Sequence, residues 1–336
     1  MSWQHFPGYN LPRGLKTNAF TSRASNMTDH PDRLPDQSWH AVVEPATPAE
    51  VENYLIDEIF KALGLRADSR WRTWFGSLFI PIVRGFSRRA AEFDEFVAQH
   101  GFRQAAQEWL KKWIPRLQII GNEQIPSEGP LLIAANHPGT FDGLAVASAL
   151  PRRDLRIVAA ANPFFRTLPN TRRYFIYATR DTHVRMTTLR RALEHLQSGG
   201  ALLIFPSGRL DPDPLHFKPA ARQALARWSD SIKLLLRKTP QARLVLAINA
   251  GFVASAYLRH PFVRLRSQDE GRQKLAEFIQ VIQQVVFNRQ IAEKVRVILS
   301  SPFTLSQLKA GDQDIQQKII ETASNLLDAI PSDDIR

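Results

Sequence analysis

A histidine and an aspartate five residues apart, His137 and Asp142, follow an apolar run of the chain, Leu131 to Ala135. An apolar run of this length suits a strand buried on both faces better than a helix, which needs ten or more residues. His137 is therefore expected at the carboxyl end of a strand. In open α/β sheets, that edge is where ligands bind.

The two side chains have the chemistry of a general base. Residues five apart on a continuous helix point about 140° apart, but Pro138 and Gly139 interrupt regular geometry, so a turn can return Asp142 to His137. A carboxylate bonded to one ring nitrogen fixes the tautomer and makes the other nitrogen a better proton acceptor. The alternative is an ordinary loop histidine with Asp142 as a helix cap, because Asp is a common N-cap.

Composition restricts the classes of chemistry. With 336 residues, 44% of them hydrophobic, the chain can bury a large core. It has no cysteine, which excludes disulfides, thiolate metal sites and a cysteine nucleophile.

The net charge of +12 indicates a phosphate-bearing partner. Ten arginines and only two acidic residues lie between Arg152 and Arg191. No RNA-binding strand motif, zinc module or basic zipper accompanies this charge, so we expect phosphates on small molecules or membranes and no nucleic acid. The alternative is a solvated basic surface without a dedicated partner.

A segment rich in aromatic residues and arginine, Trp71 to Arg89, favours contact with a membrane surface. Its apolar part is about ten residues long, too short to cross a bilayer. A second helix, expected from about Ala90 to Ile114, carries further Phe and Trp residues and ends in Lys111-Lys112. With no secretory signal in the first residues, we expect a cytoplasmic protein peripherally associated with an anionic membrane. The alternative is a helical hairpin packed on the sheet.

Composition and the pattern of apolar residues divide the chain into three regions. Residues 1–46 have the composition of an extended or mobile arm. Residues 47–115 are expected to be helical, beginning at Thr47-Pro48-Ala49-Glu50, which has the pattern of a capping box. In residues 116–331, short apolar runs alternate with helical stretches, which predicts an α/β domain. The expected strands are 117–120, 130–135, 155–160, 174–178, 201–205, 243–249 and 295–299.

A second turn, Pro206-Ser207-Gly208-Arg209, follows the apolar run that ends at Phe205. Turns at the ends of neighbouring strands can converge on one cleft, as a general base at His137 requires. Ser207 is a poor candidate for a nucleophile, because the chain has no G-x-S-x-G elbow.

Several boxes in order resemble the PlsC-type glycerolipid acyltransferases, the lysophosphatidic acid and glycerol-3-phosphate acyltransferase family. Asn136-His137 with Asp142 resembles the NHxxxxD (HX4D) box of that family, and Gly199 to Arg209 is similar to its FPEGTR box. The resemblance covers about Arg116 to Phe252. Three further segments are similar to family elements: Phe175–Arg180, His216–Ala220 and Leu244–Ile248.

The resemblance implies a mixed, largely parallel central sheet flanked by helices, with an N-terminal helical part. It also implies phospholipid biosynthesis: transfer of a fatty acyl group from an acyl thioester, acyl-CoA or acyl carrier protein, to a hydroxyl of a glycerophosphate or lysophospholipid. The thioester is a co-substrate, and no bound cofactor or metal is implied. His137 would be the general base, oriented by Asp142. The substrate-binding residues implied by the resemblance are Arg180, Ser207, Gly208, Arg209 and Lys218.

The chain departs from the family at the second box. Ser207 stands where the family has glutamate, and the arginine, Arg209, lies one place forward. Asp211 or Asp213 is a candidate to supply the missing carboxylate. Two alternatives therefore stay open: an acyltransferase for a different lipid or sugar hydroxyl or amine, and a catalytically degenerate member that binds acidic lipid.

Overall fold

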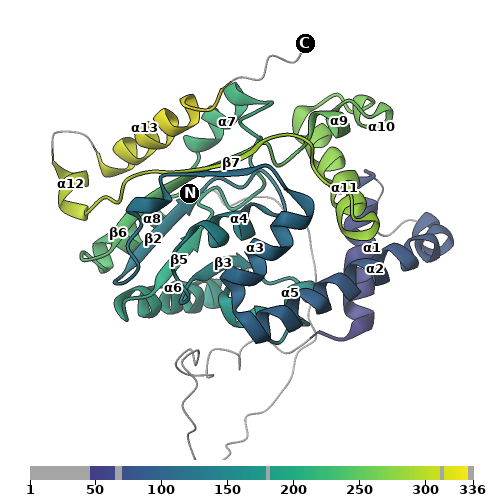
Figure 1. The fold of residues 1–336 in the computed structure, drawn as a ribbon, viewed down its shortest axis with the longest axis horizontal. Coiled ribbons are helices and arrows are strands. Elements are labelled where there is room, and N and C mark those ends of the chain that lie inside the picture. The colour runs from purple at the N-terminus through teal and green to yellow at the C-terminus, as the bar shows by residue number, and fades with distance from the viewer. Residues whose placement is uncertain (1–45, 65–69, 179–181, 311–313, 332–336) are drawn as a thin grey trace, which may run out of the picture. The chain divides into compact units, whose positions relative to one another are not determined.

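The computed structural model describes residues 46–64, 70–178, 182–310 and 314–331 (Figure 1). The predicted arm, residues 1–46, lies outside this part of the chain except for Ala46, and so does Arg180. The described residues contain one seven-stranded sheet with the order β1-β7-β6-β2-β5-β3-β4. The strands are β1 Leu117–Ile120, β2 Leu131–Ala135, β3 Arg156–Ala160, β4 Phe175–Ala178, β5 Ala201–Ile204, β6 Arg243–Ala250 and β7 Val295–Leu299.

Strand β2 lies at the centre of the sheet, parallel to β5 on one side and to β6 on the other. Strands β3 and β4 continue the parallel arrangement beyond β5. The exception is β7, which runs antiparallel to β6 and parallel to β1. The prediction of a mixed, largely parallel sheet is confirmed.

Helices cover both faces of β2, which explains its unbroken apolar sequence. Leu131, Ile133 and Ala135 pack in the core beneath α3 and α4, whereas Leu132 and Ala134 face the opposite core. The first face is covered by α3 (Phe102–Trp113) and α4 (Asp142–Ala149). The second is covered by α6 (Thr182–Gln197), α7 (Lys218–Leu225), α8 (Ser231–Lys238), α12 (Leu305–Lys309) and α13 (Ile315–Asp328).

The predicted first helix is confirmed as α1 (Pro48–Ala62), with a complete capping box between Thr47 and Glu50. The next helix corrects our expectation of a separate segment before a helix from Ala90. Residues Arg70–His100 form one helix, α2, which continues through Pro81. Tertiary packing outweighs the tendency of Pro81 to break the helix, because Val83 is buried against Ile59 and Phe60 of α1. The break comes instead at Gly101, with φ 79°.

Further helices follow β5 and β6. Residues 218–238 form two helices, α7 and α8. After β6, α11 spans Asp269–Phe287, and α12 begins after its cap, Thr304. Short elements that give no periodic signal are α5 Pro163–Arg166, α9 Ser255–Leu258, α10 Pro261–Arg264, η2 Asn122–Gln124 and η3 Thr171–Tyr174. Within the described ranges, no helix combines the length and apolar character needed to cross a membrane.

Candidate active site

Two asparagines join the ends of the central strands. The side-chain amide of Asn136, directly after β2, donates to the carbonyl of Asn249 on β6 (2.9 Å) and accepts from its backbone N–H (2.7 Å). The Asn249 amide in turn donates to the Asn136 carbonyl (2.9 Å). Both side chains are buried. These reciprocal bonds replace the ladder where the strands separate, and they fix the start of the turn that carries His137.

The structure brings His137 and Asp142 into direct contact. Nδ1 of His137 lies 2.8 Å from Oδ2 and 3.0 Å from Oδ1 of Asp142. The same Oδ2 accepts the backbone N–H of Gly139 (3.0 Å), so the carboxylate also closes the turn between the two residues. This pairing places the ring proton on Nδ1 and leaves Nε2 as the basic atom.

Asp142 does not cap its helix. It is the first residue of α4, whose N-cap, Phe141, makes no side-chain capping bond. The Asp142 carboxylate instead turns back toward His137 and is only 1% exposed. The His137 side chain, by contrast, is 34% exposed. A buried carboxylate behind a partly exposed imidazole is the arrangement expected of an oriented general base.

The turn after β5 meets the same histidine, as the sequence predicted. Asp211 accepts the backbone N–H of His137 at Oδ2 (3.0 Å) and donates its own N–H to the His137 carbonyl (2.7 Å). The Ser207 hydroxyl lies 2.9 Å from the same Oδ2. The ring of Phe205 packs against the imidazole, with 4.6 Å between centroids. Strand ends far apart in the sequence therefore form one site.

Asp211 is the nearer of the two aspartates considered as replacements for the family glutamate. It is 2% exposed, and its Oδ1 has no hydrogen-bond partner among the described residues. Burial raises the pKa of Asp211, although its bonds to His137 and Ser207 act in the opposite direction. Asp213 has a structural position instead, because its carboxylate accepts the backbone N–H groups of Leu215, Gly251 and Val253.

The other residues implied by the resemblance lie in different surroundings. Gly208 has φ 65°, a conformation that favours glycine, and both Gly208 and Arg209 are exposed. Lys218 donates to the carbonyls of Asp328 (3.2 Å) and Ile330 (2.8 Å), so its ammonium is engaged at the carboxyl end of α13. Arg180 lies outside the described residues.

Acidic groups around His137 govern its protonation. Burial lowers the pKa of His137, but the charge and hydrogen bond of Asp142, together with the charges of Glu277 and Asp211, outweigh burial and raise the pKa to about 9. Near neutral pH the His137 ring is therefore protonated on both nitrogens before substrate binds, and the fraction with a free Nε2 increases as the pH rises.

The sequence analysis missed the contribution of α11. Gln273 donates to the carbonyls of Pro138 (3.0 Å) and Asp211 (2.8 Å), and Glu277 accepts two bonds from Thr140. The only signal in the sequence was a set of polar residues at helical spacing, a pattern typical of a solvent-facing surface.

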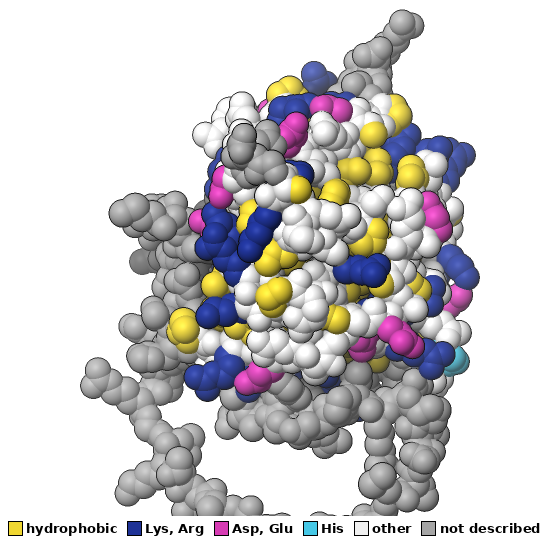
Figure 2. Space-filling view, turned by 90° about the vertical axis from the view of Figure 1, so that its left-hand side faces the viewer, with side chains coloured by type: hydrophobic (Ala, Val, Ile, Leu, Met, Phe, Trp, Pro, Cys, Tyr) yellow, Lys and Arg dark blue, Asp and Glu magenta, His cyan; other side chains and the backbone are white. Residues whose placement is uncertain are grey.

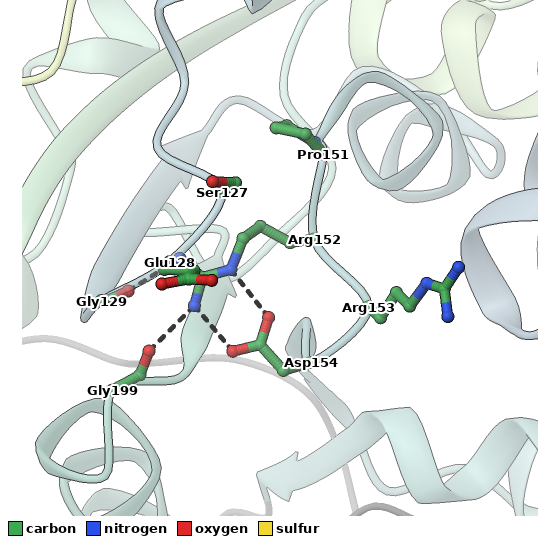
Figure 3. A pocket seen from close by; sticks show the side chains of 8 residues that line it. All are labelled: Ser127, Glu128, Gly129, Pro151, Arg152, Arg153, Asp154 and Gly199. Carbon is green, nitrogen blue, oxygen red and sulfur yellow. Dashed lines mark hydrogen bonds and ion pairs between the residues drawn. The ribbon is translucent and has the colours of Figure 1, made fainter. Parts of the chain in front are cut away.

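A hollow of about 420 Å³ lies at the opposite edge of the sheet, before β2, β3 and β5 (Figure 3). Arg152 crosses it and is only 3% exposed. Its guanidinium pairs with Asp154 (2.6 and 2.7 Å) and donates to the carbonyls of Gly129 (2.7 Å) and Gly199 (2.8 Å). These bonds connect three loops, so Arg152 stabilises the fold at this edge of the sheet rather than binding a ligand.

The basic charge does not gather into one stripe on the face drawn in Figure 2. There, Lys and Arg side chains are spread over the surface with Asp and Glu between them. This distribution differs from the concentrated basic surface that a nucleic-acid-binding protein presents.

Comparison with known proteins adds to this geometry. The chain is 31% identical over 196 residues to the uncharacterized proteins Rv0502 of Mycobacterium tuberculosis and Mb0514 of Mycobacterium bovis, covering 53% of this chain and 52% of each relative. It therefore spans about half the length of these curated relatives. The crystal structure of the 1-acyl-sn-glycerophosphate (LPA) acyltransferase PlsC from Thermotoga maritima aligns with a TM-score of 0.41 at 16% identity, covering 86% of this chain and 98% of that one.

Residues 116–253 match the family described as Acyltransferase. This range contains the turn with His137 and Asp142 and the turn from Ser207 to Asp211, but not α11. The match to the Acyltransferase family therefore covers both turns that form the candidate site.

Proposed function

We propose that this chain transfers a fatty acyl group from an acyl thioester, acyl-CoA or acyl carrier protein, to a hydroxyl of a glycerophosphate or lysophospholipid. The observation that carries the proposal is the contact between His137 Nδ1 and the buried carboxylate of Asp142 (2.8 Å), at the carboxyl edge of the sheet. The family assignment of residues 116–253 supports the same reaction class.

In the proposed reaction, Nε2 of His137 removes the proton from the acceptor hydroxyl while that oxygen attacks the thioester carbonyl carbon. The tetrahedral intermediate then collapses, the C–S bond breaks, and the thiolate leaves with the proton from the imidazolium. Asp142 stabilises the imidazolium through Nδ1–H and holds the ring in position. The exposed Arg209 is available to pair with the acceptor phosphate, and Gly208 permits close backbone approach.

Labelled acyl-CoA or acyl carrier protein, incubated with glycerol 3-phosphate and a panel of lysolipids, tests this proposal. We expect acyl transfer by the natural chain and a loss of roughly 10²- to 10⁴-fold in His137→Ala, the usual contribution of a general base. His260→Ala is a matched control, because His260 lies before α10 and not in this site. Equal activity in His137→Ala would contradict the mechanism.

Salt-sensitive liposome binding without turnover would instead favour a degenerate lipid-binding member.

A different acceptor is the second candidate, and Ser207 is the observation that favours it. Its hydroxyl lies 2.9 Å from Asp211 Oδ2, at the position where related boxes carry a glutamate. A shorter neutral side chain changes both the space and the charge beside His137, which suits a different lipid or sugar hydroxyl or amine. Ser207→Glu tests this reading, because increased acylation of glycerol 3-phosphate would show that residue 207 directs acceptor choice. Unchanged acceptor preference would contradict it.

We also propose peripheral attachment to an anionic membrane from the cytoplasmic side, through the first half of α2. Trp74 is 80% exposed and Leu78, one turn later, is 65% exposed, so both lie on one apolar face with Phe75 beside them. The exposed Arg84 follows on the same helix. Tryptophan and leucine with nearby arginine suit the boundary between lipid and water.

Liposome co-sedimentation measures this attachment. We expect Trp74→Ala with Leu78→Ala to weaken partitioning by roughly 10²- to 10⁴-fold, because each of the two side chains contributes about 1.5–3 kcal/mol when buried in lipid. Met186→Ala is the matched control, since Met186 is 61% exposed on α6, on the other side of the sheet. Equal binding by the double variant would contradict this surface.

A further inference from the structure

Helix α11 buries an unusual polar stripe. Gln273, Glu277, Gln280 and Gln284 are all less than 9% exposed and follow one another at intervals of four, three and four residues. This spacing places them on one face of the helix. Buried polar side chains are costly unless they are bonded, so their partners indicate what the face does.

Gln273 and Gln280 bind backbone groups of the loops at the carboxyl edge of the sheet, whereas Gln284 donates to the carbonyl of Trp113 at the end of α3 (3.4 Å). Besides its bonds to the Pro138 and Asp211 carbonyls, Gln273 accepts the N–H of Asp213 (2.9 Å). Gln280 accepts the N–H of Ala254 (2.7 Å) and donates to the carbonyl of Phe252 (2.7 Å), in the loop after β6. One helix, outside the range that matches the Acyltransferase family, therefore ties together the loops after β2, β5 and β6.

Glu277 binds the turn between His137 and Asp142. Its Oε1 accepts the backbone N–H of Thr140 (2.5 Å) and the Thr140 hydroxyl (2.7 Å). Gly139 leaves room for this approach, because a Cβ there would lie 3.1 Å from the Cβ of Phe252, closer than an ordinary contact, and 3.5 Å from Glu277 Oε1. The carboxylate thus holds the middle of the turn, while Asp142 holds its end.

The charges facing this turn come from three elements. Asp142 at the start of α4, Asp211 in the loop after β5 and Glu277 on α11 all act on His137. Burial raises the pKa of Glu277 to about 7, against the bonds from Thr140 and the positive charge of His137. Glu277 is therefore ionised above about pH 7, in the range where His137 is still protonated.

We propose that Glu277 is a positioning residue for acyl transfer: through Thr140 it fixes the turn that carries His137 and Asp142, and its negative charge stabilises the protonated imidazole. The inference rests on the proposed function for its catalytic consequence, but the placement and charge of Glu277 can be tested without turnover.

The charge is tested by NMR titration of the His137 ring, assigned with His137→Gln, in the natural chain and in Glu277→Gln. The glutamine keeps an oxygen for both Thr140 bonds and removes only the charge. We expect the pKa of His137 to fall by about one, because the negative charge of Glu277 is one of the charges that raise it. Glu321→Gln, on the exposed side of α13, should leave the titration unchanged. An unaltered His137 titration in Glu277→Gln would overturn the proposal.

The positioning is tested by kinetics in Glu277→Ala, which loses the charge and both bonds. We expect kcat to fall at least tenfold with KM within about threefold, because a loosened turn misplaces the base rather than the binding site. If this variant does not fold, Thr140→Val, at an exposed position, removes the hydroxyl bond alone and should lower kcat about threefold. Unchanged kcat in the folded variant would overturn the proposal. Absence of acyl transfer by the natural chain would refute the proposed function instead, while the titration would still decide the role of the charge.

Discussion

Replacing Asp142 with asparagine gives a quantitative test of the paired imidazole. Both carboxylate oxygens lie within 3.0 Å of His137 Nδ1, and Oδ2 also accepts the Gly139 N–H. Whichever way the asparagine amide turns, its NH₂ group comes close to Nδ1 and competes with the ring proton there. The proton then moves to Nε2, which can no longer act as the base.

The size of the effect follows from that geometry. Loss of an oriented general base costs roughly 10²- to 10⁴-fold in rate, or about 2.7–5.5 kcal/mol in activation free energy. Asp142 is also the strongest of the charges that raise the pKa of His137 to about 9. The rising limb of the pH–rate profile should therefore move from about pH 9 toward the ordinary histidine value of about 6.5 in Asp142→Asn.

The rate and the pH of the rising limb are both measured by the steady-state release of free thiol from acyl-CoA between pH 6 and 10. Asp230→Asn, an exposed position before α8, is a matched control and should behave like the natural chain. Asp142→Asn whose rate on the high-pH plateau stays within threefold of the natural chain would refute the reasoning. So would a lower rate with the rising limb still near pH 9.

Three further predictions concern the support of the site. Asn136→Ala removes the side-chain partners of the buried backbone N–H and carbonyl of Asn249, so it should lower the free energy of unfolding by roughly 2–4 kcal/mol in urea titrations. Because burial raises the folded-state pKa of Glu277 to about 7, its contribution to the free energy of unfolding is present below about pH 4.5 and is lost as the pH rises through 7. Calorimetry should therefore show that, between pH 4.5 and 8, the free energy of unfolding of Glu277→Gln rises by on the order of 3 kcal/mol relative to that of the natural chain. Gly139→Ala places a Cβ 3.1 Å from Phe252 and should cost about 1–3 kcal/mol in the same titrations and lower kcat, whereas unchanged stability would show that the turn has room.

Local patterns in the sequence were sufficient to predict several parts of this molecule. The buried run of β2, the capping box at Thr47 and the alternation of strands and helices are encoded by neighbouring residues. The contact between His137 and Asp142 could also be predicted from local sequence, because both residues lie within one short turn. The prediction of an acyltransferase domain, which came from a resemblance spread over several boxes, is confirmed by the family match over residues 116–253.

Tertiary packing decided the rest. Polar residues at helical spacing in α11 have the sequence pattern of a solvent-facing surface, yet packing beside the sheet buries Gln273 and Glu277 against the turn that carries His137. Lys218 follows a strand-end loop as the resemblance requires, but the position of α13 directs its ammonium to the carbonyls of Asp328 and Ile330. Periodicity predicts which residues are apolar together, whereas the partner of a polar side chain depends on which distant segment packs against it. Strand order and helix placement set that proximity, and they arise from the fold as a whole.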